Sequence, residues 1–489
     1  MPILIVTNSP KDWPTQIENV QVIDARSYLT DPAYCEMKGI KLFNLCRSYR
    51  YQTTGYYVSL LAEARGHRPL PSITTVQDLK NQAIVRIVSD ELDEMIQSCL
   101  SRIKSDKFTL SVYFGHNMAR RYDRLALQLF NQFQAPLMRA HFVRLENGWQ
   151  LRRIAAISAN EVPETHWPFV INMATEHFAK KRGGVRRRSR TRFDLAILHN
   201  PQDPEPPSDA KALKKFMKAA ESLGMSAELI ERDDYGRLAE FDALFIRDTT
   251  AVDNYTYRFS RRAVGEGLVV IDDPVSIVRC TNKVYLAELL SRHKVPTPKT
   301  IVVHRDNSLA VAAELGLPLV LKRPDSSFSQ GVVKVDTKEE LAEKLEAFFA
   351  KSDLIVAQEF LPTTFDWRIG VIDKYPLYAC KYYMAAGHWQ IIDQARQGRG
   401  RYGRSETLPI EMAPRKAVQA ALKAANLIGD GFYGVDVKQS DGGFYVIEVN
   451  DNPNADAGVE DAILRDDLYL RIMNVFLSRI EQRKARSYT

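Results

Sequence analysis

The alternation of hydrophobic and polar positions predicts strand–helix units in the middle of the chain. The stretch 193–200, FDLAILHN, is apolar enough for a buried strand, and 210–225 carries apolar residues at helical spacing. Shorter apolar runs at 227–230, 243–248 and 268–272 predict further strands. Strands that alternate with helices at this spacing indicate a small parallel α/β unit.

The N-terminal third also mixes both periods. A strand is predicted at the chain start, and a helix from Gly55, because Tyr56, Leu60, Leu61 and Ala64 recur at helical spacing. We favour helix-face packing for the tyrosines of 48–67 over stacking on bases. Further elements are predicted as a strand at 108–114, a helix at 117–133 and a hairpin at 140–157. Residues 1–190 show no catalytic constellation.

The length of 489 residues indicates about three domains. We expect an N-terminal α/β domain at 1–190, a small parallel α/β domain at 193–280 and a third domain at 281–480. The expected fold class is therefore α/β, with α+β character in the third domain.

Composition narrows the class of protein. Hydrophobic residues make up 45% and charged residues 26%, which excludes wholesale disorder and fibrous proteins. No apolar run approaches the roughly 18–20 residues that span a bilayer, and the start lacks the basic region of a signal peptide. The five cysteines are scattered and odd in number, which argues for a reducing compartment and against a cysteine metal site. We expect a soluble, cytoplasmic protein without membrane contact.

The positive charge is concentrated in one segment. The formal net charge is +7, and 180–192, KKRGGVRRRSRTR, holds eight basic residues and no acid. We favour a solvated basic linker between domains. The alternative is a contact site for RNA or another anionic partner, and a nucleic acid is the less favoured partner.

Two lysines stand at positions suited to phosphate recognition. Lys283 precedes a predicted helix, and Lys322 ends the apolar strand 317–321. A Ser-rich loop with Ser326 and Ser327 follows Lys322 and leads to Gly331. Free backbone N–H groups and a lysine point charge suit anionic oxygens, although a plain hairpin turn has the same pattern.

A third segment, 354–373, joins two predicted strands. The first strand runs into Gln358, Glu359, Phe360 and Leu361, and an Asp-x-Arg pair, Asp366 and Arg368, begins the second. The extended backbone there could meet an adenine edge, and a carboxylate a few residues later could accept ribose hydroxyls.

The fourth segment, 429–454, predicts a hairpin around Asp441-Gly442-Gly443. A three-residue loop would place Asp436 opposite Glu448, with Asn450 on the same face, whereas a two-residue loop would turn Glu448 away. Two carboxylates and an amide oxygen suit Mg²⁺. Because the neighbouring residues are apolar and buried acids need a partner, we favour a metal site over a solvated hairpin face.

In this order, the four segments resemble the ATP-grasp ligases, and within them the RimK-like branch. The resemblance rests on the VPTP helix exit, on QEFL followed by D-x-R, and on IEVN-D-NP, and it covers roughly 280–480. Residues 193–280 resemble the α/β domain that precedes ATP-grasp domains in such enzymes. Residues 1–190 resemble the N-terminal extension of a longer RimK-like group.

The resemblance implies roles by position. Lys283 and Lys322 would hold phosphates, with the 325–331 loop, including Ser326, Ser327 and Gly331, closing over them. Gln358, Glu359, Phe360 and Leu361 would meet the adenine, and Asp366 the ribose. Arg368 would stabilise the transferring phosphoryl group, and Asp436, Glu448 and Asn450 would bind Mg²⁺, with Mn²⁺ as an alternative ion.

One stretch departs from the family pattern. In the strand 376–385, Lys381 stands where RimK-like ligases usually have an arginine, so we assign it a catalytic role. The following segment has Asp393 rather than a clear asparagine. Its four arginines, which could clamp an anionic substrate, are Arg396, Arg399, Arg401 and Arg404. A solvated loop is the alternative.

The resemblance implies an ATP-dependent carboxylate–amine ligase that works through an acyl phosphate. The added unit would be L-glutamate or another amino acid, and the acceptor a peptide, a small molecule or a protein tail. The alternative is a nucleotide-gated RNA- or ribosome-binding protein with lost ligase activity. We expect a homo-oligomer. The acyl and amine substrates, the α- or γ-linkage and the role of 1–190 are left open by the sequence.

Overall fold

The computed structural model describes residues 3–37, 40–179, 192–325, 331–393, 396 and 401–486. The chain forms two compact units. The first comprises Met1–Arg188 with Asp233–Glu240, and the second Ser189–Arg232 with Phe241–Thr489. Within the described residues, no helix combines the length and the apolar character that a bilayer crossing requires.

The first unit contains a parallel and an antiparallel sheet. The parallel sheet has the order β2-β1-β3-β4, and the antiparallel sheet the order β5-β6-β7. The strands are β1 (Ile3–Thr7), β2 (Val20–Asp24), β3 (Lys41–Asn44), β4 (Arg68–Leu70), β5 (Lys107–Tyr113), β6 (Leu137–Leu145) and β7 (Gly148–Ala156). The helices are α1 (Ala25–Thr30), α2 (Ala33–Glu36), α3 (Thr54–Ala64), α4 (Ile73–Asp78), α5 (Gln82–Glu91), α6 (Asp93–Leu100), α7 (Asp123–Phe133) and α8 (Trp167–Ala179).

The predicted elements of this unit are present, with one shifted boundary. The predicted helix from Gly55 is α3, and the predicted hairpin is β6–β7. The helix predicted at 117–133 begins only at Asp123. Arg120–Tyr122 forms a 3-10 helix ahead of it, and the side chain of Asp123 accepts a hydrogen bond from the backbone N–H of Asn117, at 2.9 Å, which ties the preceding loop to the helix start.

The second unit begins with the predicted parallel α/β structure. Its sheet has the order β11-β10-β8-β9. The strands are β8 (Phe193–His199), β9 (Met225–Ile230), β10 (Ala243–Arg247) and β11 (Val269–Ile271). Its helices are α9 (Ala210–Ser222), α10 (Tyr255–Gly265), α11 (Pro274–Thr281) and the C-terminal α16 (Asp466–Arg486). Counted along the chain, both parallel sheets have the strand order 2-1-3-4, a similarity that the sequence does not reveal.

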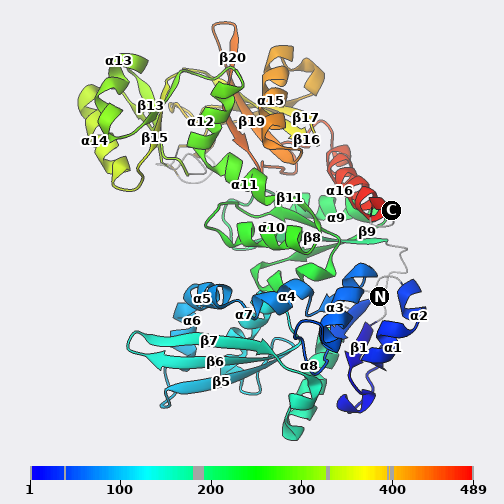
Figure 1. Ribbon diagram of the computed structural model, residues 1–489. Coiled ribbons are helices and arrows are strands. Elements are labelled where there is room, and N and C mark those ends of the chain that lie inside the picture. Colours follow the sequence, from blue (N-terminus) through cyan, green and yellow to red (C-terminus); the bar gives the residue numbers. More distant parts are fainter. Residues whose placement is uncertain are drawn as a thin grey trace. The chain divides into compact units, whose positions relative to one another are not determined.

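Two antiparallel sheets complete the second unit. The smaller has the order β12-β15-β13-β14 and the larger β18-β17-β16-β19-β20. The strands are β12 (Thr300–Val303), β13 (Leu319–Lys322), β14 (Val332–Val335), β15 (Ile355–Glu359), β16 (Phe365–Ile372), β17 (Tyr375–Tyr383), β18 (Ser405–Leu408), β19 (Phe432–Ser440) and β20 (Gly443–Asn450). The helices are α12 (Lys283–Arg292), α13 (Val311–Leu315), α14 (Lys338–Phe349) and α15 (Arg415–Ile428). Figure 1 shows α13 and α14 beside the smaller sheet and α15 against the larger.

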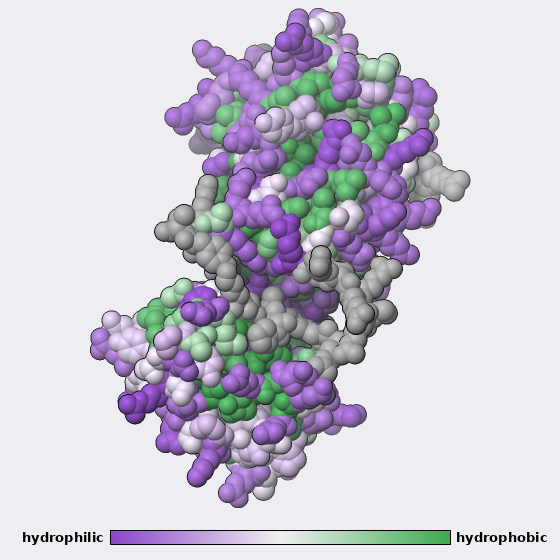
Figure 2. Space-filling model, turned by 90° about the vertical axis from the view of Figure 1, so that its right-hand side faces the viewer, coloured by the Kyte–Doolittle hydropathy of each residue, from purple (hydrophilic) through white to green (hydrophobic). Residues whose placement is uncertain are grey.

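Buried hydrophobic residues form several cores, and one of them joins the parallel sheet of the second unit to the larger antiparallel sheet. The larger antiparallel sheet packs Trp367, Ile369 and Val435 against the alanine-rich face of α15, including Ala417 and Ala421. On the face shown in Figure 2, hydrophilic residues dominate the surface, with hydrophobic residues in patches between them. The fold is α/β with antiparallel components, as predicted.

Candidate active site

One face of the five-stranded sheet carries charged side chains from three neighbouring strands. Arg368 of β16 lies opposite Asp436 of β19, and Asp436 lies opposite Glu448 of β20. The Arg368 guanidinium donates to both carboxylate oxygens of Asp436, with Nε–Oδ1 at 2.5 Å and Nη2–Oδ2 at 2.9 Å. Asn450 donates its amide to Asp436 at 3.4 Å. The predicted metal residues therefore meet beside Arg368.

The route by which Glu448 reaches this face differs from the prediction. The hairpin turn is the two-residue Asp441-Gly442, both with positive φ, and not the predicted three-residue loop. A two-residue turn alone would place Glu448 on the far face. The register shifts by one between Asp436 and Val437, so Ile447 is the extra residue of a β-bulge. The bulge restores the opposition of Asp436 and Glu448.

Lys283 joins the carboxylates from a helix. It is the first residue of α12, and Asn282 caps this helix by accepting the backbone N–H of Tyr285. The ammonium of Lys283 lies 3.1 Å from Glu448 Oε1, and the side chain is 8% exposed. Helix capping thus fixes the position of a buried cation next to a predicted metal ligand.

Lys322 approaches from the smaller sheet. It ends β13 and is buried, and its ammonium donates to Gln358 Oε1 at 2.8 Å. The amide of Gln358 in turn donates to Thr300 Oγ1 at 2.9 Å. Lys283, Lys322, Gln358 and Thr300 line one pocket together with Ile447 and other apolar residues. The two predicted phosphate lysines therefore face a shared pocket between the two antiparallel sheets.

Burial and neighbouring charges set the pKa values of this cluster. Burial lowers the pKa of Lys322 to about 8, although Glu448 acts in the opposite direction. Burial alone would raise the pKa of Glu448, but Lys283 and Lys322 outweigh it and hold that pKa below its usual value. Burial raises the pKa of Asp436 despite the nearby Arg368. The cluster therefore consists of buried, oppositely charged side chains that pair with each other.

Asp366 belongs to the same face, with a partner that sequence reasoning missed. Lys438 lies 2.8 Å from Asp366 Oδ1, and Thr363 donates to the same oxygen at 2.8 Å. The sequence offered one signal for Lys438, because it lies two residues after Asp436 in a strand and so shares its face. Asp366 is held in place by these two groups, and its contact with a ribose stays a prediction.

The segment predicted to meet adenine leaves the edge of β15. Glu359 is tied to Lys299, whose backbone O accepts the Glu359 N–H at 2.9 Å. The Phe360 ring lies 5.0 Å from the ammonium of Lys334 and 5.9 Å from the Trp389 ring. Leu361, just past the strand, is partly buried. The adenine contact stays a prediction.

The structure does not bring Lys381 to the cluster. It lies opposite Trp367 in the β16–β17 pairing, one residue out of phase with Arg368. Its ammonium lies 5.3 Å from the Trp367 ring and 3.8 Å from Glu406. Because neighbouring residues of a strand point to opposite faces, Lys381 is on the far face from Arg368.

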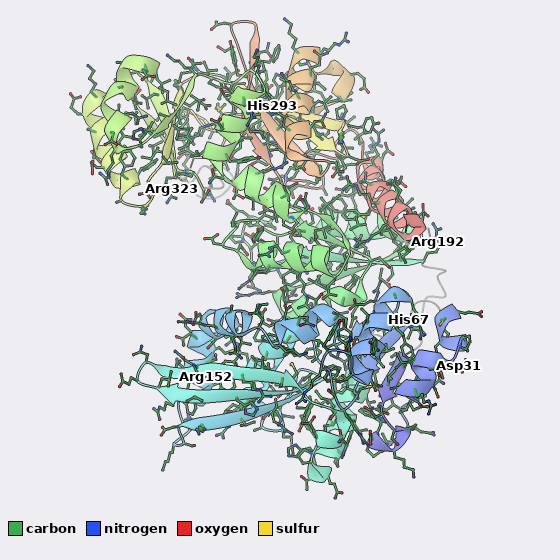
Figure 3. The ribbon with its side chains drawn as sticks, viewed as in Figure 1. Asp31, His67, Arg152, Arg192, His293 and Arg323 are labelled. Carbon is green, nitrogen blue, oxygen red and sulfur yellow. The ribbon has the colours of Figure 1, made fainter. Side chains whose placement is uncertain are left out.

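The phosphate loop is described only at its ends. Ser326 and Ser327 lie outside the described residues. Gly331 has φ +74°, and a Cβ there would lie 2.3 Å from Arg323 Nε, so both backbone conformation and space favour glycine. Arg323, labelled in Figure 3, donates its backbone N–H to the Gly331 carbonyl at 2.9 Å.

The described arginines of the predicted substrate loop each have a partner within the chain. Arg396 lies 3.0 Å from Asp393, Arg401 pairs with Glu205, and Arg404 stacks 3.9 Å from the centre of the Tyr383 ring. Arg399 lies outside the described residues. The structure thus presents them in intramolecular contacts, and an anionic substrate there stays a prediction.

Only the last residue of the basic run 180–192 is described. Arg192 donates to Glu481 of α16 at 2.8 Å, and Figure 3 labels it. The remainder of that run lies outside the described residues.

The residues present fit Mg²⁺. Asp436, Glu448 and Asn450 offer carboxylate and amide oxygens from two paired strands, the donor type that Mg²⁺ prefers. The described residues contain no cluster of three or more His, Cys, Asp or Glu side chains suited to a metal. A Mg²⁺ ion here would therefore depend on Asn450 and on substrate phosphates for further ligands.

Comparisons with known proteins agree with this geometry. The family model "RimK-like ATPgrasp N-terminal domain" matches residues 25–173, and the "RimK-like ATP-grasp domain" matches 280–465. The alpha-aminoadipate–LysW ligase LysX of Saccharolobus solfataricus is 30% identical over 261 residues, which cover 49% of this chain and 88% of that protein. A probable alpha-L-glutamate ligase of Vibrio vulnificus is 29% identical, and the matched residues cover 47% of this chain and 74% of that protein.

A second probable alpha-L-glutamate ligase, from Thioalkalivibrio sulfidiphilus, is 30% identical over 229 residues, which cover 46% of this chain and 73% of that protein. The similarity to these ligases and the match of both domains identify the family. The chain belongs to the RimK-like ATP-grasp family of ATP-dependent carboxylate–amine ligases, with a RimK-like N-terminal domain ahead of the ATP-grasp domain.

Proposed function

We propose that this ligase joins the amine of an acidic amino acid, with L-glutamate as the first candidate, to a carboxylate on a peptide, small molecule or protein tail. One observation carries the proposal: two ion pairs, Arg368–Asp436 and Lys283–Glu448, lie on neighbouring strands of one sheet, and Lys283 lines a pocket together with the buried Lys322. The names of the relatives support the amino-acid class, because they specify alpha-aminoadipate and L-glutamate.

The charge of each side chain determines its proposed role. Lys283 and Lys322 would bind the phosphates of ATP, with Asp366 and the segment after β15 holding the nucleoside. Asp436, Glu448 and Asn450 would hold Mg²⁺, which neutralises phosphate charge when it is bound. Arg368, a fixed planar donor, would stabilise the transferring phosphoryl group. Such positioning and charge neutralisation account for catalysis in phosphoryl transfer without a side-chain nucleophile.

The proposed reaction has two steps. A carboxylate oxygen attacks the terminal phosphorus of ATP, the bond to ADP breaks, and an acyl phosphate forms. The amine nitrogen then attacks the acyl carbon, phosphate leaves, and the amine loses a proton as the amide forms. The products are an amide, ADP and phosphate.

The test is ADP release from Mg²⁺-ATP across a panel of amino acids, with mass spectrometry of the products. Lys322→Ala and Glu448→Ala are the inactive controls, and Lys351→Ala, at an exposed lysine in the turn after α14, is the matched variant. We expect amino-acid-dependent ADP release in the parent and in Lys351→Ala alone, with a mass increment that names the added unit. Equal turnover in all four proteins would contradict the proposal.

The acceptor is the component that a small-molecule panel can miss. A parallel reaction in cell extract, with isotope-labelled glutamate, tests a peptide or protein acceptor by label transfer that needs Lys322. The nucleotide-gated RNA-binding alternative gains no specific support from the described part of the chain. The homo-oligomer stays a prediction for a measurement of mass in solution.

A further inference from the structure

Two buried carboxylates of the second unit have oxygens without a hydrogen-bond partner, although Thr250 makes a side-chain hydrogen bond to Asp451. Asp272 is 1% exposed and Asp451 is 7% exposed. Within the described part of the chain, neither oxygen of Asp272 accepts a hydrogen bond, and Oδ2 of Asp451 accepts none either. Buried carboxylates are normally paired, because desolvation without compensation is costly. Both residues therefore need an explanation.

The fold brings these two residues to one edge. Asp272 follows β11, which pairs with β10 through Phe245 and Ile271, so it lies beside the carboxyl end of β10. Asp451 directly follows β20, and the next residue, Asn452, donates to the Asp248 carbonyl at 2.6 Å. The loop after β20 is thereby anchored to the end of β10. Ligands of open α/β sheets bind at this edge.

The neighbouring acid shows that Asp272 is not merely a capping residue. Asp273 caps α11 by accepting the backbone N–H groups of Val275 and Ser276, at 3.0 and 3.1 Å. Ser260 donates its hydroxyl to the main-chain carbonyl of Asp272, at 2.6 Å, which holds its backbone and not its carboxylate. The side chain of Asp272 is thus held at the edge without a task in helix capping.

The cation that acts on Asp272, Arg247, is already engaged elsewhere. The Arg247 guanidinium is fully buried and donates to Ser208 at 3.0 Å, to Asn452 at 2.6 Å and to the Pro453 carbonyl at 2.7 Å, besides the Pro207 carbonyl. It acts on Asp272 only through its field. Burial, and to a smaller extent the negative charge of Asp451, raise the pKa of Asp272 well above its ordinary value, whereas Arg247 lowers it. The edge has an excess of buried carboxylates over cations.

We propose that Asp272 and Asp451 form a binding site for one monovalent cationic group. Its source is either a free potassium or ammonium ion or the protonated amino group of the amine substrate. The first source is independent of the ligase reaction, whereas the second rests on the proposed function. A single positive charge between the two carboxylates would compensate the excess, and this site lies next to Asn450, where the predicted Mg²⁺ ligands end.

The test is the melting temperature of the full chain without ATP, in potassium, ammonium or choline chloride at equal ionic strength, and then with single amino acids in choline chloride. Choline, a bulky quaternary ammonium ion without N–H donors, serves as the reference. Asp272→Asn and Asp451→Asn keep size while removing charge, and Asp253→Asn, an exposed aspartate after β10, is the matched control.

We expect an upward shift of about 3 °C or more in potassium, in ammonium or with an amino acid, because a ligand that binds only the folded state raises its stability. The shift should persist in Asp253→Asn and vanish in the two other variants. A shift with inorganic ions identifies the first source, and a shift with amino acids alone identifies the second.

Two results would overturn the proposal. One is a melting temperature that is equal in all salts and with all amino acids, which would indicate that the two carboxylates share a proton instead. The other is a shift that survives both asparagine variants, which would place the cation elsewhere. If the variants fail to fold, thallium NMR of the parent protein can monitor whether potassium displaces bound thallium(I). This measurement tests directly whether the protein binds a monovalent cation. Both readouts omit ATP, so they separate this site from ligase activity.

Discussion

The two faces of the five-stranded sheet differ although they alternate along the same strands. One face carries Arg368 paired with Asp436 and, opposite Asp436 on the next strand, Glu448, whereas the other carries Trp367, Ile369 and Val435 packed on α15. A shift of one residue separates a buried ion pair from a hydrophobic core. In this sheet, strand register therefore decides which residues can take part in the chemistry.

Two β-bulges set that register. Without the bulge at Ile447, the two-residue turn would place Ile447 opposite Asp436 and turn Glu448 toward the core. Without the shift between Gly370 and Val371, counting from the Ile372–Tyr375 pair would place Lys381 opposite Asp366. One bulge therefore brings Glu448 to the charged face, and the other moves Lys381 away from it.

The largest expected effect comes from the packed face. Trp367→Ala should lower the free energy of unfolding of the second unit by about 3–5 kcal/mol, because it removes a large buried side chain and leaves a cavity. Hydrogen exchange of β16 and β19 measures this loss. If hydrogen exchange is unchanged in Trp367→Ala while turnover disappears, the division into a packed face and a chemical face is wrong, because Trp367 would then act in the reaction.

Arg368→Lys is the matching change on the charged face. Lysine keeps the positive charge beside Asp436 but cannot form the two-point contact. We expect turnover to fall by about 10²–10³-fold, the usual cost of removing a fixed donor to developing charge. Hydrogen exchange of β16 should stay near that of the parent. Turnover within tenfold of the parent would remove Arg368 from the proposed mechanism.

A pH profile tests the charge at the shared pocket. Because burial lowers the pKa of Lys322 to about 8, the amine is largely protonated below pH 7. Its positive charge is lost as the pH rises through 8. ATP affinity of the free protein should therefore weaken by about tenfold between pH 7 and 9.5, as expected for a lost charge-assisted contact. Calorimetric titration measures it, and Lys322→Arg, whose guanidinium stays charged, should show a flat profile. An equal decline in both proteins would assign the effect to another group.

The smallest effect is expected at Lys381. Lys381→Met should change turnover by less than about twofold, because its contact with Glu406 is a partly exposed ion pair of little energetic value. Lys438→Met provides the matched change on the charged face and should weaken ATP binding by about tenfold, since Asp366 loses its cation. A large loss at Lys381 with none at Lys438 would reverse the assignment of the two faces.

Local patterns predicted much of this molecule. The strand–helix units from 193 to 272, the helix after Lys283 and the antiparallel strands around Asp436 follow from periodicity and turn residues. The opposition of Asp436 and Glu448 was predicted from a loop length that is wrong, and a bulge compensates for it. Bulges depend on packing between distant residues, so the alternation of a single strand does not reveal them. The same limit hides the pairing of Lys438 with Asp366 and the surroundings of Asp272, because the neighbouring residues come from other strands.

The bulge at Ile447 also separates the hairpin tip from the chemistry. Between the bulge and the exposed turn Asp441-Gly442, the pairs from Val437–Val446 to Ser440–Gly443 form a short ladder of their own. Residues inserted at the tip need only preserve that ladder to leave Glu448 in phase with Asp436. The tip is thus open to divergence between relatives, and it is a natural place to graft an affinity peptide or a fluorophore without disturbing the ligase.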